Sequence, residues 1–218
     1  MSGVLSHVQG AEPPGDCPLC GRLRAFLRET SLKHPEWHNK PVASFGDPDA
    51  RLLIVGLAPG LQGANRTGRP FTGDYAGDLL YATLAKFGFA NTAFRADPTD
   101  GLRLYDTMIT NAVRCVPPAN KPTGAEINTC RQFLIGTLSA LPNLEAIVAL
   151  GRISHDSVVR ALGGRLKDAP FAHGAHHTLA NLHMFDSYHC SRYNTNTGRL
   201  TTDMFEAVFA SVQEHLGK

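Results

Sequence analysis

"RLLIVGLAPGLQGANRTGRPFTGD", residues 51–74, joins a short apolar run to a long loop. Its first part, "RLLIVGL", has the continuous apolar character of a strand that is buried on both faces of a sheet. Residues 56–74 carry five glycines, two prolines and two arginines, a composition that suits neither a strand nor a helix. The stretch therefore predicts a buried strand with a stiff, cationic loop at its carboxyl end.

The rest of the chain repeats the order of strand and helix. Apolar runs predict further strands over 106–113, 145–151 and 181–189. Apolar residues at helical spacing predict helices over 19–31, 75–89, 124–141, 154–163 and 203–217. This alternation predicts an α/β fold, a three-layer αβα sandwich with a central four-stranded parallel sheet. We expect one domain over residues 1–218, with 1–16 as a loosely ordered N-terminal arm.

Three loops follow predicted strands at the same edge of this sheet. They are residues 56–74, 111–123 and 188–199, and each has an unusual polar composition. Ligands of open parallel sheets bind beyond the carboxyl ends of the strands. The sequence therefore predicts that these three loops form the binding site.

The charge balance and the apolar runs limit the class of protein. The formal net charge is only +2, so binding to a polyanion must depend on local clusters of arginine and lysine. No apolar run approaches the ~20 residues that span a bilayer, and the N-terminus lacks the pattern of a signal peptide. We expect a cytoplasmic protein without a membrane partner.

Four of the five cysteines form two spaced pairs. Cys17 and Cys20 stand three positions apart, and Cys115 and Cys130 flank the start of a predicted helix. Four such thiolates fit either a structural zinc ion or a [4Fe–4S] cluster, and the spacing does not separate the two. Buried free cysteines are the plainer alternative. Cys190 has no partner at ligand spacing, and we expect it to be a packing residue.

Three segments carry a resemblance to a known family. "GLAPGLQGANRTGRPFTGD", "TNAVRC…C" and "YHCSRYNTNTGRLT", together with the four paired cysteines, resemble uracil-DNA glycosylase family 5, the type B enzymes. The resemblance covers nearly the whole chain in order and spacing. It implies a [4Fe–4S] cluster on Cys17, Cys20, Cys115 and Cys130, with zinc as the alternative. It also implies a monomer that acts on DNA and is associated with the nucleoid in a prokaryote.

The implied reaction is hydrolysis of the N-glycosidic bond of a flipped base, which leaves an abasic site. The base is uracil or another deaminated or damaged base such as hypoxanthine. The resemblance makes Phe71 the stacking platform, Asn111 the group that reads the edge of the base, and His189 a donor to a base oxygen that becomes negative. Three neighbouring residues are expected to line the base: Gly56, Leu57 and Ala58.

Asp74 is the expected partner of the cationic sugar and of the attacking water. In the related type A enzymes an acidic residue follows the first glycine of the motif, but this chain has Leu57 and Ala58 there. Asp74 also precedes a predicted helix, so the alternative role is a helix N-cap. Asp78, one turn later, is the second candidate for the acid.

Five further residues are expected to contact DNA. A positive or hydroxyl-bearing side chain meets phosphates and the strand without reading sequence. The last motif has His-Cys-Ser where His-Pro-Ser is usual, so the loop that fills the space of the flipped base loses a φ constraint. The five residues are Arg66, Arg69, Ser191, Arg192 and Tyr193.

Two other function classes stay open from the residues alone. A glycine-rich loop after a strand also suits a nucleotide-binding enzyme, although neither GxGxxG nor GxxxxGK[ST] is present. A catalytically inactive iron–sulfur or zinc module that binds DNA would retain the same cysteines. "HGAHH", residues 173–177, is expected to be a polar loop and not a separate metal site.

Overall fold

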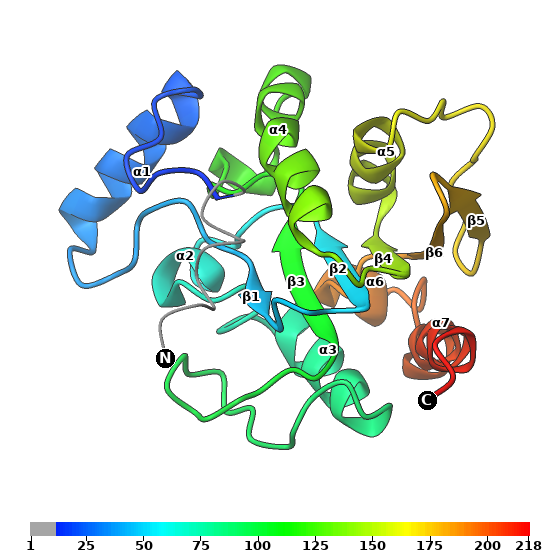
Figure 1. The fold of residues 1–218 in the computed structure, drawn as a ribbon. Helices are drawn as coiled ribbons and strands as arrows, with labels where there is room; N and C mark the ends of the chain where they lie inside the picture. The colour runs from blue at the N-terminus through cyan, green and yellow to red at the C-terminus, as the bar shows by residue number, and fades with distance from the viewer. Residues whose placement is uncertain (1–11) are drawn as a thin grey trace.

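The computed structural model describes residues 12–218, and a six-stranded sheet runs through this part of the chain (Figure 1). The strand order is β1-β3-β2-β4-β6-β5. Their bounds are β1 Phe45–Gly46, β2 Leu52–Gly56, β3 Thr107–Asn111, β4 Ala146–Leu150, β5 His176–Leu179 and β6 Leu182–Ser187. The four inner strands are parallel, and the two edge strands pair antiparallel. The predicted parallel strands are thus confirmed, but the expected total of four strands was wrong.

The inner strands form where the sequence is continuously apolar. Every residue of β2, β3 and β4 is buried, because helices cover both faces of the sheet. The parallel register places Gly56 at the end of β2 directly beside Asn111 at the end of β3. The hydrogen-bond ladder of the sheet therefore fixes the positions of two residues of the expected site.

The edge strands were missed for a physical reason. β1 is only two residues long, and β5 is built from a polar, histidine-rich stretch. Residues 176–179 pair antiparallel with β6, so the expectation of a polar loop over 173–177 was wrong at its carboxyl end. An edge strand pairs on one side only and does not need the apolar character that predicts a central strand.

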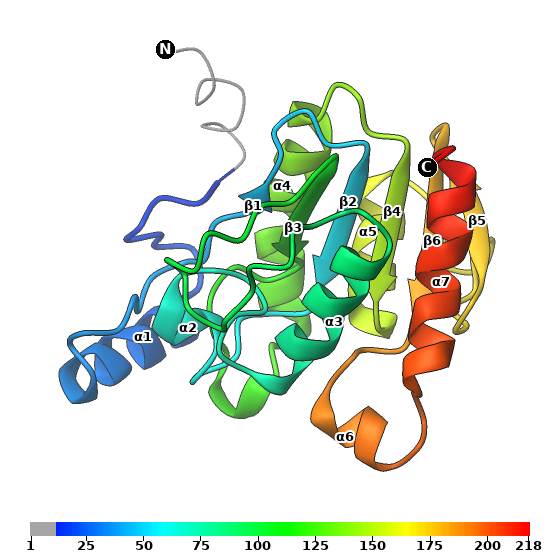
Figure 2. The ribbon, with the colours of Figure 1, turned by 90° about the horizontal axis from the view of Figure 1, so that it is seen from below.

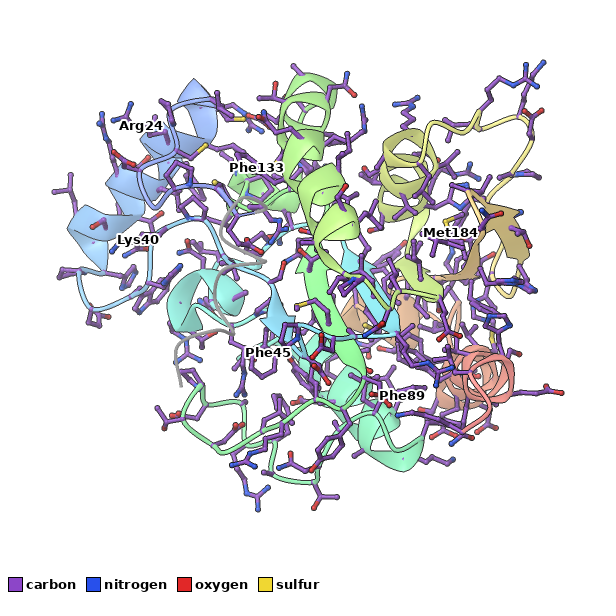
Figure 3. The ribbon with its side chains drawn as sticks, in the orientation of Figure 1. Arg24, Lys40, Phe45, Phe89, Phe133 and Met184 are labelled. Carbon is purple, nitrogen blue, oxygen red and sulfur yellow. The ribbon has the colours of Figure 1, made fainter. Side chains whose placement is uncertain are left out.

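Helices pack on both faces of the sheet and give the three predicted layers. Figure 2 shows α3 and α7 on one face, with α4 and α5 on the other. Phe89 belongs to the apolar cluster on the side of α3 and α7, and Met184 belongs to the cluster on the side of α4 and α5 (Figure 3). The helix bounds are α1 Gly21–Lys33, α2 Ala64–Thr67, α3 Tyr75–Lys86, α4 Gly124–Ala140, α5 Arg152–Ala161, α6 Arg192–Asn196 and α7 Thr202–His215, with a 3-10 turn over Pro118–Asn120.

The N-terminal arm expected over 1–16 lies mostly outside the described residues, which begin at residue 12. Glu12 forms an ion pair of 2.9 Å with Arg114, a fully buried guanidinium that also donates to Thr137. The described end of the expected arm is therefore tied to the core.

None of the helices between residues 12 and 218 combines the length and the apolar character needed to cross a bilayer.

Candidate active site

A pocket of about 1050 Å³ opens at the carboxyl edge of the parallel strands. All three loops that were expected to form the binding site contribute to its wall. The pocket also reaches residues 150–154, where β4 ends and α5 begins. The rule that ligands bind beyond the carboxyl ends of parallel strands locates this pocket.

Asn111 and Phe71 line the pocket, and Gly56 lies against both of them but is not part of the pocket lining. A Cβ atom on Gly56 would lie 2.6 Å from Cζ of Phe71 and would also collide with Oδ1 of Asn111. Glycine is therefore the residue that lets the ring and the carboxamide approach each other. Phe71 has a φ of +52°, an unusual conformation for a large side chain, which indicates that its surroundings hold the ring in place.

Asp74 has two roles in the geometry. One carboxylate oxygen accepts a hydrogen bond from the backbone N–H of Gly77 at 3.3 Å and so caps α3. The other oxygen, Oδ2, faces the glycine loop, and a Cβ atom on Gly60 would lie 2.9 Å from it. Burial raises the pKa of Asp74, although backbone N–H groups of α3 oppose the change. The cap expected from the sequence is present, and the same side chain lines the pocket.

His189 lies opposite Phe71 in the pocket, with the two ring centroids 6.1 Å apart and the planes inclined by 26°. Burial lowers the pKa of His189 to about 4, so the imidazole is neutral at neutral pH. Its Nδ1 has no hydrogen-bond partner within the described residues. Asn194 donates to the backbone carbonyl of His189 at 2.8 Å and fixes the loop. The next residue, Cys190, is fully buried in the core, which confirms its expected packing role.

Arg69 is almost completely buried, which argues against the DNA contact expected from the sequence. Its side chain is only 6% exposed and holds Asp100 through two hydrogen bonds of 2.8 Å. The pair holds the pKa of the Asp100 carboxyl far below its ordinary value, mainly through the Arg69 hydrogen bonds. The composition of the loop suggested that the positive charge of Arg69 binds DNA. Asp100, 31 positions away, neutralises this charge inside the protein.

The other expected DNA contacts are more exposed. Arg66 is exposed and donates to the backbone carbonyl of Gln62. Ser191 caps α6, and Arg192 begins it; both line the pocket. Tyr193 is 73% exposed. The sequence missed Arg152 and Phe171 in the wall, although Arg152 stands beyond the end of a predicted strand, the signal that identified the other loops.

The four paired cysteines line a second cavity, of about 240 Å³, beside α1. Arg24, Lys40 and Phe133, labelled in Figure 3, also line it. Burial raises the pKa of the Cys115 thiol to about 12, and the neighbouring cysteines add to this. Within the described chain, no three of the four sulfur atoms lie within 4.8 Å of one another.

A separate buried cluster joins α5 to the far edge of the sheet. His155, His177 and Asp186 each offer a ligand atom within 4.8 Å of the others. His155 lies 2.8 Å from the Asp186 carboxylate through Nδ1 and 2.8 Å from the backbone carbonyl of Ala169 through Nε2. Burial alone would lower the pKa of His155, but the hydrogen bond and charge of Asp186 outweigh it and raise the pKa. Two acceptors around one ring favour a doubly protonated imidazolium, and we interpret the cluster as a structural ion pair.

Comparison with known proteins identifies the family. Residues 43–213 match the family described as the Uracil DNA glycosylase superfamily. The chain belongs to the uracil DNA glycosylase superfamily. It is 45% identical over 208 residues to a type-5 uracil-DNA glycosylase of Thermus thermophilus, with 92% of this chain and 94% of the relative covered.

More distant relatives agree. The chain is 36% identical over 197 residues to a type-5 uracil-DNA glycosylase of Pyrobaculum aerophilum, covering 88% of this chain and 86% of that one. A type-4 uracil-DNA glycosylase of the same organism is 33% identical over 131 residues, 60% of this chain and 59% of the relative. The resemblance to family 5 is thus confirmed. As a uracil DNA glycosylase, the protein is a hydrolase of DNA repair whose substrate is DNA.

Proposed function

We propose that this glycosylase flips uracil, or another deaminated or damaged base such as hypoxanthine, into the pocket and hydrolyses its N-glycosidic bond. The observation that carries the proposal is the gathering of Phe71, Asn111, His189 and Asp74 in one pocket at the carboxyl edge of the sheet. The names of the type-5 relatives support uracil as a substrate. The product is an abasic site in DNA.

Recognition of the base rests on Phe71 and Asn111. The ring of Phe71 provides a flat apolar face on which a flipped base stacks. The carboxamide of Asn111 both donates and accepts, which matches the edge of a pyrimidine. The lack of a side chain at Gly56 lets the ring and the carboxamide lie close together. Leu57 and Ala58 line the same pocket without a charge, and this supports the wider range of bases.

Departure of the base depends on His189. When the N-glycosidic bond breaks, the electron pair of the bond goes to the base, and negative charge develops on a base oxygen. A neutral imidazole donates one N–H to this oxygen and stabilises the charge in a site shielded from water. The lowered pKa of His189 is compatible with this role, since no proton has to be transferred.

The sugar becomes cationic in the same step, and we assign its stabilisation to Asp74. The carboxylate oxygen that does not cap α3 faces the glycine loop. There it stabilises the positive sugar and accepts a proton from the water that attacks C1′. Neither Leu57 nor Ala58 is able to do this. The cap on α3 holds Asp74 in place during the reaction.

We also propose that Cys17, Cys20, Cys115 and Cys130 hold a [4Fe–4S] cluster. The four thiols line one cavity, and four thiolates suit such a cluster or a zinc ion. The resemblance to family 5 supports the cluster. When bound, the cluster supplies a cross-link between α1, the loop after β3 and α4. Iron and sulfide analysis with a visible spectrum tests this, and stoichiometric zinc would contradict it.

The glycosylase proposal is tested with matched DNA duplexes that contain uracil, hypoxanthine or no lesion. The purified protein is incubated with each, and alkali then cleaves the strand at any abasic site. Cleavage at uracil and at hypoxanthine is expected, and an intact uracil strand would overturn the proposal. Cleavage at uracil alone would reject the wider range of bases.

We further propose that the enzyme works as a monomer in the cytoplasm, close to the nucleoid in a prokaryotic cell. Sedimentation at working concentration tests the monomer, and a stable dimer would contradict it.

A further inference from the structure

Three arginines that line the pocket share an unusual setting. They come from residues 150–154 and 188–199, and we call this part of the lining the cationic wall. Each is exposed, lines the pocket, and lies over an aromatic ring. The guanidinium carbon of Arg152 is 5.2 Å from the ring centroid of Phe171, that of Arg192 is 5.4 Å from Tyr75, and that of Arg199 is 4.6 Å from Tyr188. The three rings, those of Phe171, Tyr75 and Tyr188, also belong to the pocket wall.

None of the three guanidinium groups forms an ion pair with any carboxylate of residues 12–218. Other arginines of the chain do, as in the Arg69–Asp100 pair. Asp74 is the one acidic residue among the described residues that line the pocket, and it caps α3. The positive charge of this wall is therefore left uncompensated by the protein.

Stacking on a ring has a mechanical effect on an exposed arginine. The planar guanidinium rests on the face of the ring, attracted by its π electrons. Its N–H groups then point outward at the edge of the plane, where they match the two oxygens of a phosphate. An arginine held in this way loses less conformational freedom on binding than a free one.

The place of the three arginines in the fold matches the backbone of a flipped nucleotide. Arg152 and Arg192 are the first residues of α5 and α6, and Arg199 lies between α6 and α7. The three arginines line the same pocket as Phe71 and Asp74 of the glycine loop. A base that stacks on Phe71 and binds Asn111 brings its own phosphodiesters to the rim of the pocket.

We propose that Arg152, Arg192 and Arg199 form a phosphate clamp that binds the phosphodiesters flanking the flipped nucleotide, with Phe171, Tyr75 and Tyr188 as positioning rings. The clamp rests on the proposed function. It adds Arg152 and Arg199 to the DNA contact expected of Arg192, and it assigns a purpose to the three rings. The clamp binds charge and not sequence, so it serves any lesion that enters the pocket.

The test measures DNA binding by fluorescence anisotropy and single-turnover cleavage between about 50 and 200 mM salt. R152A and R199A should each weaken binding several-fold at low salt and reduce the salt slope by about one. The cleavage rate at saturating enzyme, measured beside the affinity, separates a loss of DNA binding from a loss of chemistry. R103A, at an exposed arginine outside the pocket, is the matched control.

A double-mutant cycle pairs each arginine with a phosphate, by placing a neutral methylphosphonate at one linkage beside the uracil at a time. The wild-type enzyme should lose affinity for the modified DNA. R152A and R199A should each lose no further affinity when the methylphosphonate replaces the phosphate that the missing arginine would bind. Y188L should reduce the salt slope as R199A does, and Y188F should restore it, since a phenyl ring still supports the guanidinium.

The clamp would be overturned if R152A and R199A kept the salt slope of the wild-type enzyme. It would also be overturned if both variants lost as much DNA affinity to the methylphosphonates as the wild-type enzyme does. A wild-type enzyme that binds DNA with the predicted slope but does not cleave uracil would overturn the proposed function and leave the clamp standing. Thermal unfolding of every variant shows whether a loss of affinity follows a loss of fold, and Y188F remains informative where Y188L fails to fold.

Discussion

The two walls of the pocket are built in opposite ways. The glycine wall, residues 56–74, is made of close backbone approaches and buried side chains, and a Cβ atom at Gly56, Gly60 or Gly63 would collide with a site residue. The cationic wall, residues 150–154 and 188–199, presents exposed arginines that have no carboxylate partner in the described chain. The first holds the proposed reacting groups by close contacts, and the second offers charge to a flexible strand. We therefore expect substitutions in the glycine wall to change mainly the rate of reaction, and substitutions in the cationic wall to change mainly the affinity for DNA.

The sharpest test of this separation is Asp74→Asn in the glycine wall. Asparagine caps a helix as well as aspartate, so α3 should keep its stability while the negative charge is lost. We expect the single-turnover rate to fall by about 10²–10⁴-fold, with DNA affinity nearly unchanged. Asp78→Asn, one turn along the same helix, is the control and should retain the rate. A fully active Asp74→Asn enzyme would leave Asp74 as a cap alone.

Arg69→Met tests whether the buried arginine of the glycine wall stabilises the fold or binds DNA as the arginines of the cationic wall are proposed to do. Removing it leaves the Asp100 carboxylate buried without its partner, and breaking such a pair costs about 3–5 kcal/mol in the free energy of unfolding. Urea denaturation measures this loss. The salt slope of DNA binding should not change. A stable Arg69→Met variant with a reduced salt slope would restore the phosphate contact expected from the sequence.

Gly63→Ala probes the closeness of the glycine wall directly. The new Cβ would collide with Oδ2 of Asp74 and displace the carboxylate, so we expect a fall of about tenfold or more in the single-turnover rate. Gly124→Ala is the matched control, because a Cβ there meets nothing within 4 Å. Equal rates for the two variants would show that the position of Asp74 is not critical.

The pH dependence of the single-turnover rate is the mildest of these tests. Burial raises the pKa of Asp74 above its ordinary 3.8, so the rate should fall as the pH drops through that raised pKa, and Asp74→Asn should abolish the limb. His189 has a pKa of about 4 and stays neutral at higher pH. A limb near pH ~6.5 that disappears in His189→Gln would contradict this assignment.

Local patterns in the sequence predicted the parts of the fold that depend on local chemistry. The apolar runs located β2, β3 and β4 because burial on both faces requires them. The alternative role given to Asp74, a helix N-cap, is confirmed because an N-cap is recognised from the next few residues. The same reasoning failed for the edge strand His176–Leu179, whose pairing is set by β6 and not by its own composition.

The parts that the sequence missed depend on partners far along the chain. The residues near Arg69 do not predict its ion pair with Asp100, which lies 31 positions later. The cationic composition of the loop therefore suggested DNA binding instead. Phe171 gains its place in the wall from a long loop before β5, and its partner Arg152 begins a helix on another segment. Composition shows how many charges a loop carries, and tertiary structure decides which of them are free.

The pairing of Gly56 with Asn111 sets the position of the carboxamide independently of the loops around it. Asn111 stands at the end of a strand pair, whereas Leu57 and Ala58 belong to the loop that follows β2. Under the role proposed for Asn111, we expect substitutions at Leu57 or Ala58 to change which bases fit without moving the carboxamide.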